Sequence, residues 1–141
     1  MSETLGNTQR GELTPELAEL VAQARAVRER AYAPYSHFLV GAALRAENGQ
    51  VFVGCNVENA SYGATICAER AAITAMIAAG QRSITEIAVF TDAETLAMPC
   101  GLCRQVISEF QKDARLVVAN PRQQRVLGFA EIFPEPFVLD R

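Results

Sequence analysis

The chain has 141 residues, of which 50% are hydrophobic and 21% are charged, a balance typical of one globular domain. Its formal net charge of -3 argues against a protein that binds nucleic acid by neutralising phosphates. No apolar run reaches the ~18 residues of a membrane span, and the start of the chain lacks a secretory signal pattern. We therefore expect a cytoplasmic protein without a membrane or nucleic-acid partner, with residues 1–13 as a flexible tail and residues 14–141 as a single domain.

The first expected helix begins at Thr14. This residue can cap the helix, Pro15 suits the first helical position, and Glu16 favours the positive end of the helix dipole. Apolar residues then recur at three- and four-residue steps, which predicts one buried face. Because Pro34 disfavours helical geometry in the residue before it, the helix should end near Ala31.

Two strands, residues 38–46 and 51–57, are expected next. Asn48 and Gly49 lie between them and are typical of a tight hairpin turn, so the strands should pair antiparallel. Further elements are predicted in the order helix, strand, helix, strand, strand and a final helical turn, at residues 67–79, 84–91, 101–112, 116–119, 125–129 and 130–133. This order predicts an α/β fold, a three-layer α-β-α sandwich with a mixed, roughly five-stranded sheet.

Four cysteines occur in the chain, and in a reducing compartment they are not expected to form disulfides. Cys100 and Cys103 form a Cys-x-x-Cys pair, which is either a redox motif or half of a metal site. A redox motif would normally stand without a third cysteine and a glutamate at another helix start, where Cys67 and Glu69 are found. Three sulfurs at two helix starts therefore favour a metal, because free backbone N–H groups stabilise thiolates there.

Zinc prefers sulfur and nitrogen ligands in a tetrahedral arrangement, so three cysteines leave one position open for a reactive water. Glu69 could exchange protons with that water, although it could instead only stabilise the helix dipole. Arg70 and Arg104 could donate hydrogen bonds to the sulfurs, or be ordinary surface residues. Cys55 lies within an expected strand and is interpreted as a core residue, and His37 as a loop residue that hydrogen-bonds locally.

At these residues the chain closely resembles the zinc-dependent cytidine deaminases of free nucleosides, in their three-cysteine form. The wider zinc deaminase signature has a glutamate two residues after the first ligand and a later Pro-Cys-x-x-Cys. The resemblance covers almost everything from position 35 to position 137. Four spaced motifs carry it: Ser36-His37-Phe38-x-Val40-Gly41-Ala42-Ala43-Leu44, Gly54-Cys55-Asn56-Val57-Glu58-Asn59-Ala60, Cys67-Ala68-Glu69-Arg70 and Pro99-Cys100-Gly101-x-Cys103-Arg104-Gln105-Val106.

The resemblance implies one zinc ion per subunit on Cys67, Cys100 and Cys103, with Glu69 as the proton shuttle. The implied reaction is the hydrolytic deamination of cytidine and deoxycytidine, with release of ammonia, in pyrimidine salvage. Zinc-activated hydroxide would attack C4 of the base.

The resemblance also implies a set of substrate contacts in a homotetramer whose sites form at subunit contacts. Asn56 and Glu58 would bind the ribose, chiefly its 3′-hydroxyl, and Phe38 would pack against the pyrimidine. The backbone N–H of Ala68 would meet the base carbonyl. Two further residues, Tyr62 and Phe137, match positions that reach a neighbouring subunit's site.

Three features depart from the family pattern. Leu102 is commonly alanine, Met98 stands where a serine usually precedes the proline, and residues 132–134 read Ile-Phe-Pro instead of Leu-Leu-Pro. None removes a ligand or the shuttle, but Leu102 and Met98 could reshape the pocket. Two rival functions remain: a deaminase of nucleic-acid cytosine or another aminated heterocycle, and a zinc-stapled structural or interaction domain.

Overall fold

The computed structural model describes residues 11–140. Most of the expected tail, residues 1–13, therefore lies outside the described residues. No helix in the described part of the chain is long and apolar enough to cross a membrane.

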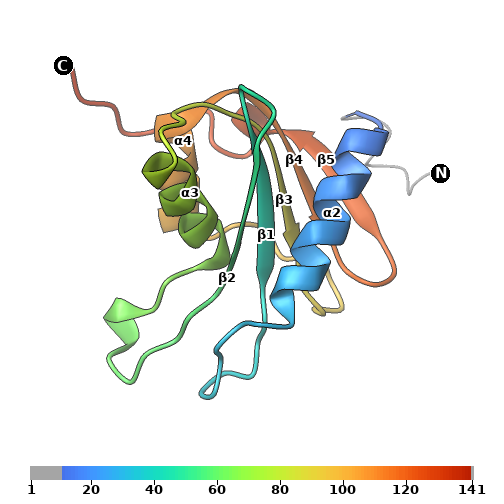
Figure 1. Ribbon diagram of the computed structural model, residues 1–141, viewed down its shortest axis with the longest axis vertical. Helices are drawn as coiled ribbons and strands as arrows, with labels where there is room; N and C mark the ends of the chain where they lie inside the picture. Colours follow the sequence, from blue (N-terminus) through green and yellow to red (C-terminus); the bar gives the residue numbers. More distant parts are fainter. Residues whose placement is uncertain (1–10, 141) are drawn as a thin grey trace.

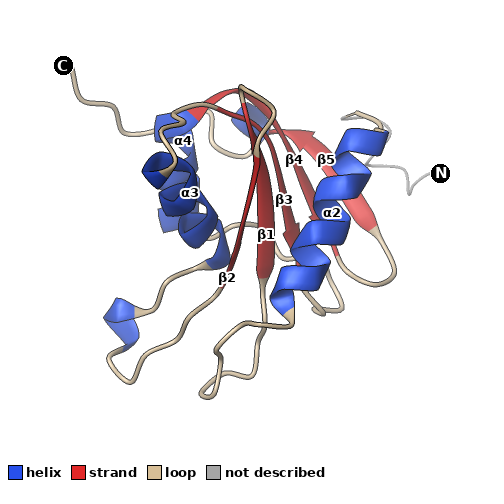
Figure 2. Cartoon of the chain, viewed as in Figure 1, coloured by secondary structure: helices blue, strands red, loops and turns tan. Residues whose placement is uncertain are grey.

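Five strands form one mixed sheet in the order β2-β1-β3-β4-β5 (Figure 2). The β3–β4 pair is parallel, and the other three neighbouring pairs are antiparallel. The mixed five-stranded sheet predicted from the sequence is confirmed. The strands are β1 (Gly41–Ala46), β2 (Val51–Cys55), β3 (Ile84–Phe90), β4 (Gln111–Ala119) and β5 (Gln124–Gly128).

Helices cover both faces of the sheet, so the predicted three-layer sandwich is confirmed (Figure 1). Helix α2 (Pro15–Arg28) packs on one face, where its buried side chains meet β1, β3, β4 and β5. Helices α3 (Ala68–Ala78) and α4 (Gly101–Phe110) pack on the other face over a second apolar cluster. Two short 3-10 turns, η1 (Tyr62–Ala64) and η2 (Phe129–Glu131), complete the elements.

Helix α2 begins as the sequence predicts. The Thr14 hydroxyl accepts a hydrogen bond from the Leu17 N–H at 3.1 Å, and Pro15 occupies the first helical position. A Thr cap of this kind stabilises a helix by about 1 kcal/mol. Leu17, Leu20 and Ala24 are fully buried against the sheet.

The first hairpin is shorter than predicted, because residues 38–40 are not part of β1 and β2 ends at Cys55. The Asn56 side chain makes the hydrogen bonds that a strand would otherwise make there. Its Oδ1 accepts from the Val40 N–H at 2.9 Å, and its Nδ2 donates to the Phe38 carbonyl at 2.8 Å. His37, at a φ of 60°, turns the chain just before this segment.

Strand β4 is longer than the predicted 116–119 segment. It begins at Gln111, directly after α4 ends at Phe110, so no loop separates the two elements. Four of its five extra residues are polar and partly or fully exposed, with only Ala114 buried, and such a stretch carries little of the alternating hydrophobic signal that marks a strand.

Strand β2 runs unusually close to the start of α3, and Gly54 makes this approach possible. A Cβ atom at Gly54 would lie 2.5 Å from both the Ala68 carbonyl oxygen and the Ala72 nitrogen, well inside van der Waals contact. Only glycine allows backbone to approach backbone in this way. The contact fixes the first turn of α3 against the end of β2.

Candidate active site

The three predicted ligands come together where α3 and α4 begin. Cys67 and Cys100 occupy the position just before α3 and α4, and Cys103 lies in the first turn of α4. The three Sγ atoms lie within 4.8 Å of one another. Tetrahedral zinc with bonds of about 2.3 Å needs sulfurs about 3.8 Å apart, so the cluster suits zinc with only small adjustments.

No fourth protein ligand joins this cluster among residues 11–140. Cys55 and His37, the other candidates in the sequence, are not members of it. A set of three thiolates matches a zinc site that keeps one position for water or substrate, whereas structural sites are closed by four protein ligands.

Arg70 moderates the negative charge of the sulfur cluster. Its Nη2 donates to the Cys67 Sγ at 3.3 Å and also lies 3.4 Å from the Thr65 carbonyl. A hydrogen bond from the Cys103 thiol, together with Arg70, lowers the pKa of Cys67 to about 5, although partial burial opposes this shift. The same hydrogen bond, with burial, raises the pKa of Cys103. A bound dication favours the thiolate form of every ligand.

Arg104 supports the site without touching sulfur. Its Nε donates to the Pro99 carbonyl at 2.8 Å, and its Nη1 donates to the Ile132 carbonyl at 3.0 Å. These bonds hold the backbone just before Cys100 against the end of η2. Arg104 therefore orients the chain that carries a ligand, whereas Arg70 binds a ligand sulfur directly.

A cavity of about 210 Å³ opens in front of the three sulfurs. Glu69 projects into it and is only 5% exposed. Burial raises the pKa of this carboxyl group above its ordinary value. Three of the predicted substrate residues, Phe38, Asn56 and Ala68, line the same cavity. The first backbone N–H groups of α3, beginning with Ala68, have no acceptor within the helix and are available to a ligand.

Glu58 and Tyr62 lie in a second hollow, which adjoins the cavity at Thr65. The Glu58 carboxylate accepts from the backbone N–H groups of Tyr35 and Ser36 at 3.0 and 3.1 Å, and also from the Ser36 hydroxyl. The Ser36 hydroxyl and these amides lower the pKa of Glu58. The carboxylate therefore stays charged at neutral pH and orders the loop beside it.

Phe137 lies apart from this cavity, on the outer side of α4. Gln105 fixes its backbone with two hydrogen bonds, from Nε2 to the Phe137 carbonyl at 2.9 Å and from the Phe137 N–H to Oε1 at 3.2 Å. The Phe137 side chain is 68% exposed and makes no part of its own chain's cavity.

Several residues that line the cavity were not predicted from the sequence. Thr65, Val89 and Thr91 form part of its wall, as does Ala97 beside Met98. Thr91 directly follows the carboxyl end of β3, where α/β sheets place their ligand-contacting residues, so this position carried a usable signal. Val89 lies within β3, and Thr65 and Ala97 lie in loops, so their positions at the cavity depend on packing that the sequence does not reveal.

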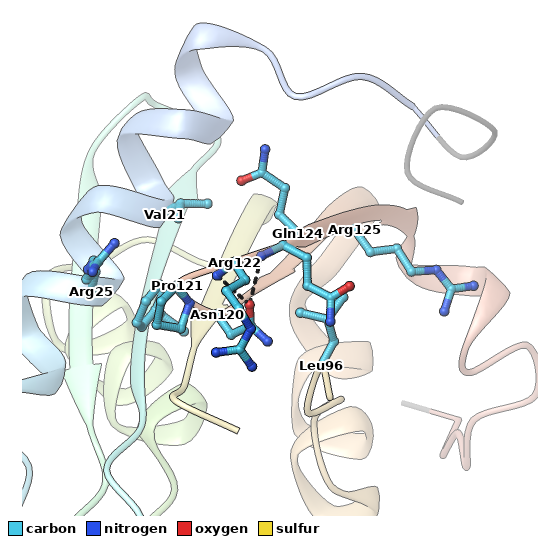
Figure 3. A pocket seen from close by; sticks show the side chains of 10 residues that line it. Val21, Arg25, Leu96, Asn120, Pro121, Arg122, Gln124 and Arg125 are labelled. Atoms are coloured by element: carbon cyan, nitrogen blue, oxygen red, sulfur yellow. Dashed lines mark hydrogen bonds between the residues drawn. The ribbon is translucent and has the colours of Figure 1, made fainter. Parts of the chain in front are cut away.

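A larger hollow, of about 530 Å³, lies on the α2 face of the sheet and is lined by three arginines (Figure 3). In Figure 3 the Arg25 and Arg125 side chains lie on opposite sides of Asn120 and do not meet at one point. The hollow contains no sulfur ligand and no carboxylate. The cavity at the cysteines, although smaller, holds every group needed for metal chemistry.

The cysteine cluster predicts that each chain binds one zinc ion, and that this binding requires three of the four cysteines. Replacing Cys103 with serine should abolish stoichiometric zinc binding, because two thiolates cannot fix the tetrahedral site. Cys55→Ser is the matched control and should retain one zinc per chain. Metal analysis of the purified proteins measures this, and zinc loss in the Cys55 variant would contradict the three-ligand site.

Comparisons with known proteins agree with this geometry. Residues 15–120 match the family model described as the cytidine and deoxycytidylate deaminase zinc-binding region. A cytidine deaminase of Halalkalibacterium halodurans is 41% identical over 123 residues, which cover 86% of this chain and 93% of that protein. One from Sporosarcina psychrophila is 50% identical over 95 residues, covering 67% of this chain and 70% of the relative.

Solved structures give the same result. The crystal structure of cytidine deaminase from Burkholderia pseudomallei has a TM-score of 0.81 and 46% sequence identity, and the match covers 85% of this chain and 98% of that one. The family model spans the helix starts that carry all three cysteines. The chain therefore belongs to the family of cytidine and deoxycytidylate deaminases, and the cysteine cluster is its zinc site.

Proposed function

We propose that this protein hydrolyses cytidine and deoxycytidine to uridine and deoxyuridine, with release of ammonia. One observation carries the proposal: a carboxylic acid, Glu69, is almost fully buried in the same small cavity as three zinc ligands. A buried carboxyl group beside an open metal position suits proton transfer between water and substrate.

In the proposed mechanism, water adds to C4 of the cytosine ring and the bond from C4 to the amino nitrogen breaks. Zinc, when bound by the three thiolates, lowers the pKa of water so that it is a nucleophile near neutral pH. Glu69 accepts a proton from that water and donates it to N3 of the base. In a second transfer Glu69 takes the remaining proton of the added water from the new hydroxyl group on C4 and delivers it to the amine, which leaves as ammonia, so that C4 becomes a carbonyl carbon and the base becomes uracil.

The base and the sugar would occupy the two adjoining hollows. Phe38 would pack against the pyrimidine at the mouth of the cavity, and the Ala68 N–H would donate to the base carbonyl. Asn56 lines the same cavity, and after its two bonds to residues 38 and 40 it keeps one donor hydrogen and one acceptor lone pair for a sugar hydroxyl. Glu58 would accept from the 3′-hydroxyl in the second hollow.

The charge of Glu58 favours a free nucleoside over a polymer. A carboxylate at the 3′-hydroxyl repels a 3′-phosphate, and every nucleotide inside a nucleic acid carries one. A polymer-acting enzyme also needs a basic channel with stacking aromatics, and this chain has a net charge of -3 and no tryptophan.

The proposal includes a homotetramer whose sites are shared between subunits. Several large apolar side chains are strongly exposed in the single chain, which is typical of surfaces that bind another protein. They include Tyr62 at 77%, Leu102 at 67% and Phe137 at 68% exposure. Phe137 does not line the cavity that holds Glu69 in its own chain. A role at the active site of a neighbouring subunit accounts for its position.

We place the enzyme in the cytoplasm and in pyrimidine salvage. Three thiolate ligands persist in a reducing compartment, where disulfide formation does not compete with the metal. The reaction converts a preformed nucleoside, which is the chemistry of salvage.

Ammonia release from a panel of substrates tests the proposed reaction. Cytidine and deoxycytidine should both be turned over, and a cytosine within a DNA or RNA oligonucleotide should react at least about 100-fold more slowly, because its 3′-phosphate meets Glu58. Adenosine and guanosine serve as controls for other aminated rings. Faster reaction of the oligonucleotide would overturn the nucleoside assignment, and no ammonia from any substrate would favour a structural zinc domain.

Glu69→Gln tests the proton shuttle. The amide keeps the shape of the side chain but cannot accept the proton, so kcat should fall by about 100-fold or more while zinc remains bound. Steady-state kinetics and metal analysis of the same preparation separate the two effects. Near-normal turnover in this variant would remove Glu69 from the mechanism.

Light scattering and subunit mixing test the shared site. The protein should have the mass of four chains, and Phe137→Ser should lower activity. Refolding a mixture of Phe137→Ser and Glu69→Gln chains should restore activity above the sum of the separate proteins, since some sites then combine Glu69 and Phe137 from different chains. A monomeric mass would contradict the tetramer, and an absence of recovery would contradict the contribution of Phe137.

A further inference from the structure

We propose that Asn120 is a positioning residue of the active site, although it does not line the cavity that holds the three sulfurs. It directly follows β4 and lines the hollow drawn in Figure 3. The proposal rests on the function proposed above, because it concerns how the substrate wall and a zinc ligand are held.

Both the nitrogen and the oxygen of the Asn120 side-chain amide make hydrogen bonds to the protein. Its Nδ2 donates to the carbonyls of Ala93 and Glu94 at 2.9 and 3.3 Å. Its Oδ1 accepts from the backbone N–H groups of Arg122 and Gln123 at 2.9 and 2.8 Å, drawn as dashed lines in Figure 3. Asn120 is 5% exposed, so water does not readily replace these partners.

The two halves of the amide therefore have different tasks. The oxygen closes the turn between β4 and β5, a local role that Asn commonly has in turns. The nitrogen ties that turn to the segment of residues 91–100, which is distant in sequence. The Gln123 and Arg122 side chains reach the same Glu94 carbonyl only at 3.5 Å, so Asn120 makes the shortest link to it.

The segment of residues 91–100 has no helix or strand of its own. It connects β3 to α4, carries Ala97 and Met98 in the cavity wall, and ends at the zinc ligand Cys100. Arg104 holds its last part through the Pro99 carbonyl. Asn120 holds its first part, so together they fix both ends of the stretch that shapes the wall.

A single substitution can separate the local, turn-closing role of the Asn120 oxygen from the positioning role of the Asn120 nitrogen. Asn120→Asp keeps the oxygen that closes the turn, but it replaces both donor hydrogens with an acceptor that faces two carbonyl oxygens. The turn should survive, whereas the link to Ala93 and Glu94 should be lost and replaced by repulsion.

Asn48→Asp is the matched control. Asn48 lies in the exposed turn of the first hairpin, next to the amino end of β3 and thus at the opposite end of the sheet. Its Oδ1 accepts from the Gln50 N–H at 3.0 Å, and its Nδ2 donates to the Gln50 side chain at 2.7 Å. The substitution is chemically the same: it keeps the oxygen that accepts within the turn and removes the amide donor, but no active-site segment depends on that donor.

The test measures zinc release to a chromophoric chelator, hydrogen exchange of residues 93–98, and the kinetics of cytidine deamination. For Asn120→Asp we expect zinc release about 10-fold faster than in the unmodified protein, at the low end of the effect of losing a residue that contacts a ligand directly, because Asn120 acts on Cys100 through the intervening segment. Exchange at residues 93–98 should accelerate, and kcat/KM should fall about tenfold, chiefly through KM. Asn48→Asp should leave all three unchanged.

Two results would overturn the proposal: unchanged zinc release and exchange in Asn120→Asp, or equal changes in Asn48→Asp. If Asn120→Asp does not fold, Asn120→Ser replaces it and is compared with Asn48→Ser under the same criteria. Zinc release and hydrogen exchange do not depend on the substrate. If they respond as expected while cytidine is not deaminated, the proposed function fails and the positioning role stands.

Discussion

The site depends on two helices that begin with cysteine at the same edge of one sheet. Helices α3 and α4 pack on the same face, and their first turns bring Cys67, Cys100 and Cys103 together. Each helix start supplies free N–H groups and a positive dipole end, which stabilise negative sulfur without any further side chain. The metal site is therefore a product of the backbone arrangement, and side chains such as Arg70 adjust its charge.

Close backbone packing at β2 makes this arrangement rigid. Gly54 lets the strand lie against the first turn of α3, so the carbonyl of Ala68 is held almost in contact with β2. Asn56, two residues further on, then braces residues 38 and 40 with its side chain. The same short stretch of sequence thus fixes the first ligand, the mouth of the cavity and one of the proposed sugar contacts.

Much of the fold was predictable from local signals. The Thr14 cap and the Asn-Gly hairpin each depend on a few neighbouring residues, and the structure has a helix and a hairpin at those places. The zinc ligands were predictable because their spacing and helix-start position carry a direct chemical meaning.

The remaining features depend on contacts between distant segments. Residues 38–40 are a short apolar run like that of a buried strand, and only the structure shows that the side chain and the backbone N–H of Asn56 bond this segment. Arg104 follows a ligand even more closely than Arg70 does, yet it binds the Pro99 and Ile132 carbonyls, because η2 packs beside it. The bond from Asn120 to Ala93 spans 27 residues and has no signature in the sequence.

Three hydrogen bonds hold the segment between β3 and α4 through its backbone, beside the ion pair of Arg28 with Asp92 and the packing of Leu96 and Met98 against the core. The carbonyl oxygens of Ala93, Glu94 and Pro99 accept the bonds that fix it, and a carbonyl is the same whatever side chain the residue carries. The side chain of Ala97 faces the substrate cavity without holding the segment, whereas Met98 lines the cavity and also packs against the core. A substitution at Ala97 can therefore alter the range of accepted nucleosides while the metal stays bound, so this position is where new substrate preferences can evolve at little cost to the catalytic centre.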